Sequence, residues 1–220
     1  MSEKTNLLVG ALITSLVSSG LFLTGVSAWS TVYVNIINVG WSFFGLQIAG
    51  TNAQKVFLGL QGVVFVTAGE GPGTFIPWSE VSTKYPILAG TYITQCQTAG
   101  ETVFALVLVA CIFSVALLVI TIYRLFAGGN TLSAKFFAVT SAIISCAVSV
   151  TAFSNWHVQC YLAFKDNFNG EFLYGPSNPV TVTQYEYYGF NVVLVGWIYT
   201  LISTLLHILV PASVDLDKAT

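Results

Sequence analysis

The sequence has 220 residues, of which 55% are hydrophobic and only 7% are charged, and its formal net charge is −2. Soluble proteins carry about 25% charged residues. With a mean hydropathy of +0.79, this composition excludes an ordinary soluble domain and indicates an integral membrane protein. The small net charge, without any block of like charge, gives no reason to expect nucleic acid or anionic lipid as a partner.

The first apolar segment, residues 7–28, contains no charged residue. A cleaved signal peptide is the competing interpretation, because the Val-Ser-Ala sequence at 26–28 offers small residues near a cleavage point. We prefer a retained helix, since the segment is longer than the usual signal core of roughly 7–15 residues. Small residues within it, such as Ser15, Ser18 and Ser19, are expected to pack closely against neighbouring helices.

Residues 29–100 differ from this pattern, because short β-type runs alternate with glycine and proline. Residues 29–38 and 55–67 are rich in β-branched and aromatic residues and predict strands, and 69–73 predicts a turn. An open sheet edge cannot lie in hydrocarbon. We therefore expect residues 29–100 to form a β-rich loop on the outer side of the membrane.

Two further apolar runs, residues 102–123 and 136–156, are each long enough to cross a membrane, which needs roughly 20 apolar residues. They predict a transmembrane hairpin. The connecting segment, residues 124–135, contains Arg124 and Lys135 but no acidic residue. The positive-inside rule therefore places this turn in the cytosol.

A second outer loop is expected at residues 157–188. Its alternating part, 180–187, predicts a strand that extends the sheet of the first loop. Residues 189–210 form a fourth apolar run, ended by Pro211, and the tail 211–220 returns to the cytosolic side.

Together these segments predict a single membrane domain, residues 1–220. Its expected fold is a four-transmembrane-helix bundle with a small extracellular antiparallel β-sheet, and both termini are cytoplasmic. The basic residues support this orientation. The short inner segments hold Lys4, Arg124, Lys135 and Lys218, whereas the much longer outer segments hold Lys55, Lys84 and Lys165.

The four cysteines divide into two pairs. Cys111 and Cys146 fall inside predicted helices, where cysteine behaves as a small apolar residue. Cys96 and Cys160 lie just outside the hairpin helices on the same outer face. They either form a disulfide, as an oxidising compartment allows, or remain free thiols, since the sequence does not give their Cα separation.

Residues capable of catalysis are sparse. The predicted spans contain no Asp, Glu, Lys or Arg, although such residues mark proton relays in membranes. His207 is the one ionisable side chain in a span, and its position near the inner end favours a helix-packing or interfacial role. No metal-ligand cluster, nucleophile elbow or phosphate loop is present. We predict no catalytic residue, no metal and no cofactor, and therefore a protein that is not an enzyme.

Aromatic residues are abundant, at 14% of the chain. Those in the outer loops exceed what a small sheet should need for its core, and exposed apolar patches commonly mark interaction surfaces. The alternative is that each ring packs within the sheet or on the membrane. Unpaired sheet edges could also join copies. The candidate self-association contacts are Trp41, Phe43, Phe44, Phe57 and Phe168.

Three stretches carry a family resemblance. Residues 41–46, WSFFGL, are similar to the tryptophan and Gly-Leu element of the claudin first loop. Residues 154–157, SNWH, with 165–168 resemble the tryptophan that closes the third helix and the aromatic second loop. Residues 189–197 resemble the start of the fourth helix. With the four-helix order, these stretches resemble the claudin and peripheral-myelin-protein superfamily, and the final helix with Pro211 is also similar to amastins, kinetoplastid surface proteins.

The resemblance has one clear departure. Claudins carry a cysteine pair in the first loop, whereas this chain has only Cys96, far downstream, so that disulfide does not carry over. The charged pore lining does not carry over either. The resemblance implies a divergent, protist-type member, with an antiparallel sheet on a left-handed four-helix bundle.

The function that the resemblance implies is structural. It predicts lateral self-association through outer loops and helix faces into strands or arrays, at the plasma membrane. The expected partners are the lipid bilayer, further copies of the chain and other membrane proteins. An auxiliary subunit of a channel or larger complex is the first alternative. A paracellular-type pore is the second, although the uncharged spans suit it poorly. Vesicle-trafficking proteins of the MARVEL type share the helix count but usually lack so long a β-rich loop.

Overall fold

The computed structural model describes residues 3–27, 40–48, 54–67, 73–84, 91–127, 129–167, 180–186 and 188–212. Contacts divide the chain into two compact units. The first, here called the helical unit, contains Met1–Leu23, Leu106–Val150 and Val193–Thr220. The second, the sheet unit, contains Thr24–Ala105 and Thr151–Val192.

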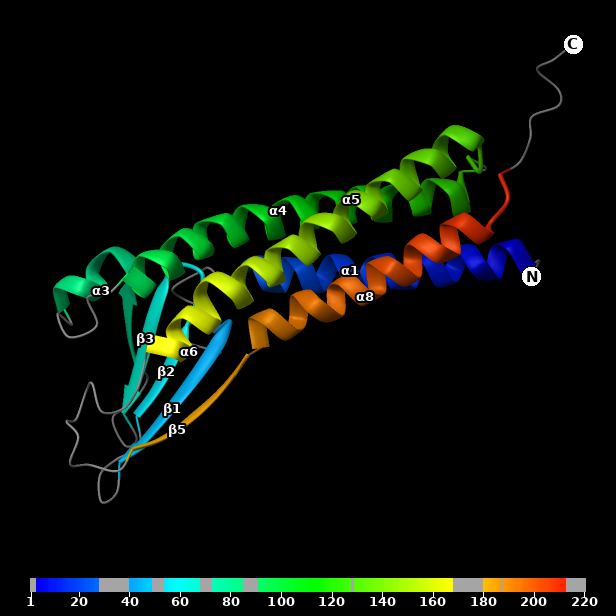
Figure 1. Cartoon of the computed structure of the whole chain (residues 1–220). Helices are drawn as coiled ribbons and strands as arrows, with labels where there is room; N and C mark the ends of the chain where they lie inside the picture. The colour runs from blue at the N-terminus through cyan, green and yellow to red at the C-terminus, as the bar shows by residue number, and fades with distance from the viewer. Residues whose placement is uncertain are drawn as a thin grey trace, which may run out of the picture. The chain divides into compact units, whose positions relative to one another are not determined.

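The described residues include four helices that are long and apolar enough to cross a membrane. They are α1 (Glu3–Ser27), α4 (Thr91–Phe126), α5 (Leu132–Trp156) and α8 (Tyr188–Leu209) (Figure 1). Helices α4 and α5 contain the apolar runs 102–123 and 136–156, and α1 and α8 cover 7–27 of the first run and 189–209 of the fourth. The chain is therefore a multi-pass membrane protein.

Two of these helices extend beyond their apolar runs. Helix α4 has 36 residues, which is about 54 Å at 1.5 Å per residue, against about 30 Å for a hydrocarbon core. Helix α5 continues through a π-helical turn, η2 (His157–Leu162), into α6 (Ala163–Asn167). The prediction that residues 91–100 and 157–167 belong to loops is wrong, because both are helical. Adding residues to a helix that has already formed costs little, so polar composition alone does not end it.

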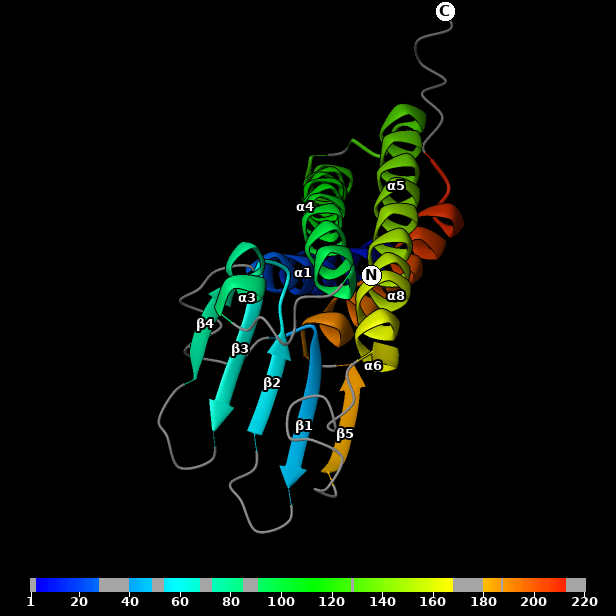
Figure 2. The same cartoon turned by 60° about the vertical axis from the view of Figure 1, so that its left-hand side comes forward.

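The sheet unit contains one five-stranded antiparallel sheet in the order β4-β3-β2-β1-β5 (Figure 2). The strands are β1 (Ser42–Ile48), β2 (Gln54–Leu58), β3 (Gly62–Thr67), β4 (Thr74–Pro77) and β5 (Val180–Glu186). Strand β5 pairs with β1, with Phe44 opposite Gln184. The prediction that residues 180–187 extend the sheet of the first loop is thus confirmed for 180–186, and residue 187 lies outside the described residues. The strand predicted at 29–38 lies outside the described residues.

One row of side chains across the sheet is almost free of solvent. It joins Ser42, Leu58, Val63 and Ile76, which lie opposite one another in register and are at most 2% exposed. The adjacent row contains Phe57 and Val64, with Phe75 packed against them. Consecutive strand residues point to opposite faces of a sheet, so the sheet carries apolar side chains on both faces here.

Helix α4 approaches the sheet closely at Gly100. A Cβ atom added at this glycine would overlap the carbonyl oxygen of Leu60, in the turn between β2 and β3. Only a residue without a side chain allows the helix backbone to lie this near the turn. Gly100, which composition alone would treat as a helix breaker, thus fixes where α4 meets the sheet.

Candidate functional site

The beginning of β1 is held in an aromatic pocket of the sheet unit. The Trp41 ring lies 5.6 Å from the Trp156 ring and 6.4 Å from the Phe190 ring, measured between centroids. The Gly189 N–H donates a hydrogen bond to the Gly40 carbonyl at 2.9 Å. A Cβ at Gly189 would come within 2.6 Å of the Trp41 ring, so a glycine here makes room for the indole.

The two tryptophans of this pocket differ in their hydrogen bonding. Both are 0% exposed. The Trp156 indole N–H donates to the Ser42 hydroxyl at 2.8 Å. The Trp41 indole N–H, in contrast, has no hydrogen-bond partner within the described structure. Buried polar groups without partners are rare. The two neighbouring tryptophans therefore differ in hydrogen bonding although they have the same side chain and the same burial.

Three of the five predicted self-association contacts prove to be core residues. Trp41 and Phe44 are 0% exposed and Phe57 is 5% exposed. The Phe44 ring packs 4.7 Å from that of Phe164, on α6. The sequence analysis treated the flanking helical extensions as loop, and it therefore underestimated the core that these rings fill. These three residues are not available as surface contacts.

The remaining two candidates have no described side chain. Phe43 occupies β1 between Phe57 on one neighbouring strand and Tyr185 on the other. Phe168 lies outside the described residues. Neither position therefore adds to the case for an aromatic contact surface, and both stay predictions.

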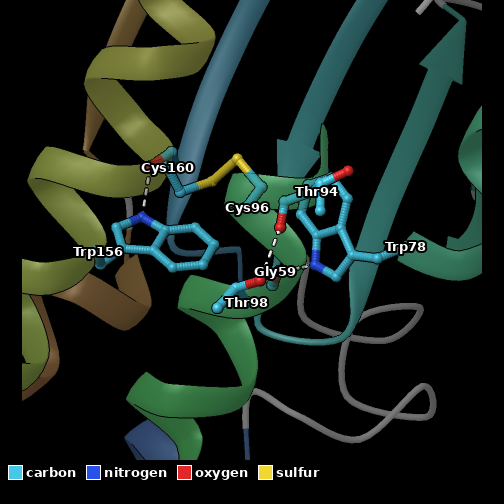
Figure 3. Close-up of a disulfide and its surroundings, with 8 residues drawn as sticks. Gly59, Trp78, Thr94, Cys96, Thr98, Trp156 and Cys160 are labelled. Carbon is cyan, nitrogen blue, oxygen red and sulfur yellow. Dashed lines mark hydrogen bonds between the residues drawn. A yellow bond between two sulfur atoms is a disulfide. The ribbon is translucent and has the colours of Figure 1, made fainter. Parts of the chain in front are cut away.

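A disulfide joins Cys96 of α4 to Cys160 of the π-helical turn (Figure 3). Of the two alternatives that the sequence left open, the structure has the bonded pair. Both cysteines are 0% exposed. The bond ties together the two helical extensions. Nearby, the Trp78 indole N–H donates a hydrogen bond to the Gly59 carbonyl at 3.1 Å, which ties α3 to the turn after β2.

The two ends of the sheet are different. Strand β4 is short and ends at Pro77, which has no N–H to offer another strand. Strand β5 has seven residues, Val-Thr-Val-Thr-Gln-Tyr-Glu, with no proline and no lysine. Among the described strands it pairs only with β1. Natural proteins commonly protect such edges with lysine, proline or short length, and β5 has none of these.

The helical unit contains a buried polar cluster around Arg124, which is only 2% exposed. Its Nε and Nη2 atoms donate to Asn130 Oδ1 at 3.0 and 2.6 Å, and Nη1 lies 2.6 Å from His207 Nδ1. The opposite ring nitrogen of His207 lies 2.9 Å from the Thr121 hydroxyl. The sequence analysis placed Arg124 in a turn, which was wrong because α4 continues to Phe126. The helix-packing role expected for His207 is confirmed.

This cluster also binds the end of α8. Asn130 Nδ2 donates to the Pro211 carbonyl at 2.9 Å, and Lys135 Nζ donates to the Ile208 carbonyl at 2.8 Å. Carbonyl groups at a helix C-terminus lack partners inside the helix and carry partial negative charge. The neutral carboxamide of Asn130 and the cationic side chain of Lys135 thus connect the α4–α5 turn and the start of α5 to the end of α8.

A network of buried hydroxyl groups joins helices of the same unit. Ser15 lies 2.9 Å from Ser203, and Ser18 contacts both Ser114 and Thr200. These bonds connect α1 to α4 and α8. The sequence analysis expected only close packing from the small residues of α1. Serine also supplies hydrogen bonds between membrane helices, and the partners on α4 and α8 could not be assigned without the fold.

The arrangement as a whole defines a class. The described residues contain four membrane-length helices, a disulfide-braced sheet and buried polar contacts between helices, and no group of three or more His, Cys, Asp or Glu side chains among them could hold a metal ion. This is a multi-pass membrane protein with an appended β-sheet. Comparison with models of known protein families and with curated proteins finds no match.

Proposed function

We propose that this protein is a structural, claudin-like component of the plasma membrane that self-associates laterally into strands or arrays, with both termini in the cytoplasm. The observation that supports it best is the unprotected edge of β5. A seven-residue strand without proline or lysine offers its outward backbone groups to another strand.

This proposed contact between copies, the edge of β5, differs from the aromatic contacts that the sequence predicts. Buried aromatics such as Trp41 and Phe44 cannot meet a second copy, whereas an edge strand can do so without rearranging the core. Four of the seven β5 residues are valine or threonine, which favour extended pairing. The disulfide between Cys96 and Cys160 cross-links two helical segments of the same unit.

The experiment uses two adjacent proline variants, Thr183→Pro and Gln184→Pro. In an antiparallel ladder, consecutive residues direct their backbone groups to opposite neighbours. One proline therefore removes a bond to β1, and the other removes only an outward N–H. We expect one variant to lose the fold of the sheet unit and the other to stay folded but become monomeric.

The oligomeric state is measured by counting photobleaching steps of labelled protein in vesicles, at matched protein-to-lipid ratios. The fold is checked by protection of the Cys96–Cys160 disulfide from mild reduction. Monomers of the unsubstituted protein at high density would contradict self-association. An oligomer that survives in the folded proline variant would assign the contact to helix faces instead. A hetero-complex of fixed stoichiometry would favour the auxiliary-subunit alternative.

A further inference from the structure

An open pocket of about 460 Å³ lies in the sheet unit, between the turn after β2, strand β4, α3 (Trp78–Lys84) and α4. Its volume falls within the range of small-ligand sites, about 300–1,000 Å³. The lining combines apolar, carboxamide and hydroxyl groups with one carboxylate. The lining residues are Leu60, Gln61, Phe75, Pro77, Trp78, Ser79, Gln97, Glu101 and Phe104.

Among the described residues that line the pocket, the one charged side chain is the acidic Glu101. Glu101 is exposed on α4, and Gln97, one turn earlier, donates to its Oε1 at 3.4 Å. These described lining residues include no lysine or arginine. The nearest basic residue of α3, Lys84, forms an ion pair with Glu80 at 2.8 Å. The pocket therefore favours a cationic group over an anionic one.

The walls are aromatic. Phe75, Trp78 and Phe104 come from β4, α3 and α4. The Trp78 ring is held by its hydrogen bond to the Gly59 carbonyl, so it does not need to be ordered by a ligand. Aromatic faces attract ammonium groups, and quaternary ammonium ions such as choline are typical ligands of aromatic cages. Aromatic rings beside a single carboxylate are the chemistry that recognises an alkylammonium ion.

The position of the pocket along α4 indicates that a lipid headgroup is the source of the alkylammonium ion. The uncharged apolar run of this helix begins at Thr102, directly after Glu101. Glu101 and Gln97 thus belong to the part of α4 that exceeds the hydrocarbon thickness, and Phe104 belongs to the part that enters it. Headgroups of phospholipids occupy this level of a bilayer.

We propose that this pocket binds the alkylammonium headgroup of a choline- or ethanolamine-type phospholipid, with Glu101 balancing its charge and Phe75, Trp78 and Phe104 surrounding it. The site would retain one lipid at the rim of the sheet unit. It is independent of the β5 edge, so it stands whether or not the chain self-associates.

The test is lipid retention measured by native mass spectrometry. The full chain is purified in detergent, equilibrated with an equimolar mixture of phosphatidylcholine and phosphatidylglycerol, and the bound lipid is identified. We expect the unsubstituted protein to keep phosphatidylcholine. Glu101→Gln should reduce this retention by roughly threefold to tenfold, because one ion pair and its alignment with the rings are lost. Phe104→Leu should act in the same direction.

Glu80→Gln is the matched control, since it removes a carboxylate from α3 that does not line the pocket, and it should leave retention unchanged. An intact Cys96–Cys160 disulfide on a non-reducing gel verifies the fold of each variant. Equal retention of the two lipids, or an unchanged preference in Glu101→Gln, would overturn the proposal. Binding of choline chloride alone, as tight as that of the lipid, would overturn the assignment to a membrane headgroup.

Discussion

The neighbouring tryptophans of the β1 pocket allow hydrogen bonding to be separated from packing. Trp41 and Trp156 are both 0% exposed and their rings are in contact. Replacing either by phenylalanine removes the same atoms and creates a comparable cavity. Only Trp156 loses a hydrogen bond, because only its indole N–H has a partner, the Ser42 hydroxyl.

The difference in stability between the two variants therefore comes from the hydrogen bonding of the two indole N–H groups. Trp156→Phe leaves the buried Ser42 oxygen without its donor, at a cost of about 1–3 kcal/mol. Trp41→Phe deletes a buried N–H that already lacks a partner and so recovers part of its desolvation cost. We expect Trp156→Phe to be the more destabilising of the two by about 2 kcal/mol.

The measurement is hydrogen exchange of the β1 amides, followed by mass spectrometry in detergent micelles. A difference of about 2 kcal/mol corresponds to roughly 25-fold faster exchange in Trp156→Phe than in Trp41→Phe. Adding Ser42→Ala to Trp156→Phe should cost little more, because the orphaned oxygen is removed. Equal exchange in the two tryptophan variants would refute this reasoning.

Three further changes test other contacts. Gly100→Ala should cost at least about 2 kcal/mol, because its Cβ overlaps a backbone carbonyl, whereas Gly20→Ala, which meets nothing within 4 Å, should not lower the thermal unfolding temperature. Removing the disulfide by Cys96→Ala with Cys160→Ala should speed proteolysis of the sheet unit. The expected loss of folding free energy is at most about 4 kcal/mol, because the two cysteines are 64 residues apart. Proteolysis as slow as in the unsubstituted protein would contradict a stabilising role of the disulfide. Arg124→Leu should destabilise the helical unit by about 2–4 kcal/mol, since its histidine and asparagine partners lose their donors. The stability of Arg124→Lys should lie between those of Arg124→Leu and the unsubstituted protein. Unfolding in graded denaturing detergent measures both variants.

Hydropathy and alternation were sufficient for the coarse architecture. The four apolar runs lie in helices, and residues 180–186 pair with the first-loop sheet, because burial in lipid and strand alternation each leave a regular pattern in the sequence. The length of α4 was not predictable in this way. Residues 91–100 mix threonine and glutamine with apolar residues, so hydropathy did not mark them as part of the span. Extending a formed helix costs little, and Tyr92, Ile93 and Cys96 of this extension are buried in the fold.

Three of the candidate contacts, Trp41, Phe44 and Phe57, are core residues for a related reason. A ring in a loop looks the same in the sequence whether it faces a partner or the chain's own core. Phe44 is buried against Phe164, a residue from another segment, and only the fold brings the two together. The hydroxyl partners of Ser18 and the histidine partner of Arg124 are likewise long-range pairs.

The place of β5 in the sheet has a consequence for how the protein is made. During synthesis, β1 can pair with β2 early, because β2 follows it closely in the chain. Its other neighbour is β5, where Ser42 pairs with Glu186. Because chains emerge from the N-terminus, the ribosome must complete α4 and α5 before β5 exists. Until then β1 has no partner on the side that β5 will occupy, and Cys96 cannot form its disulfide because Cys160 has not been made. Premature pairing between unfinished chains is therefore the hazard of its biogenesis, and truncations before residue 180 should aggregate rather than fold.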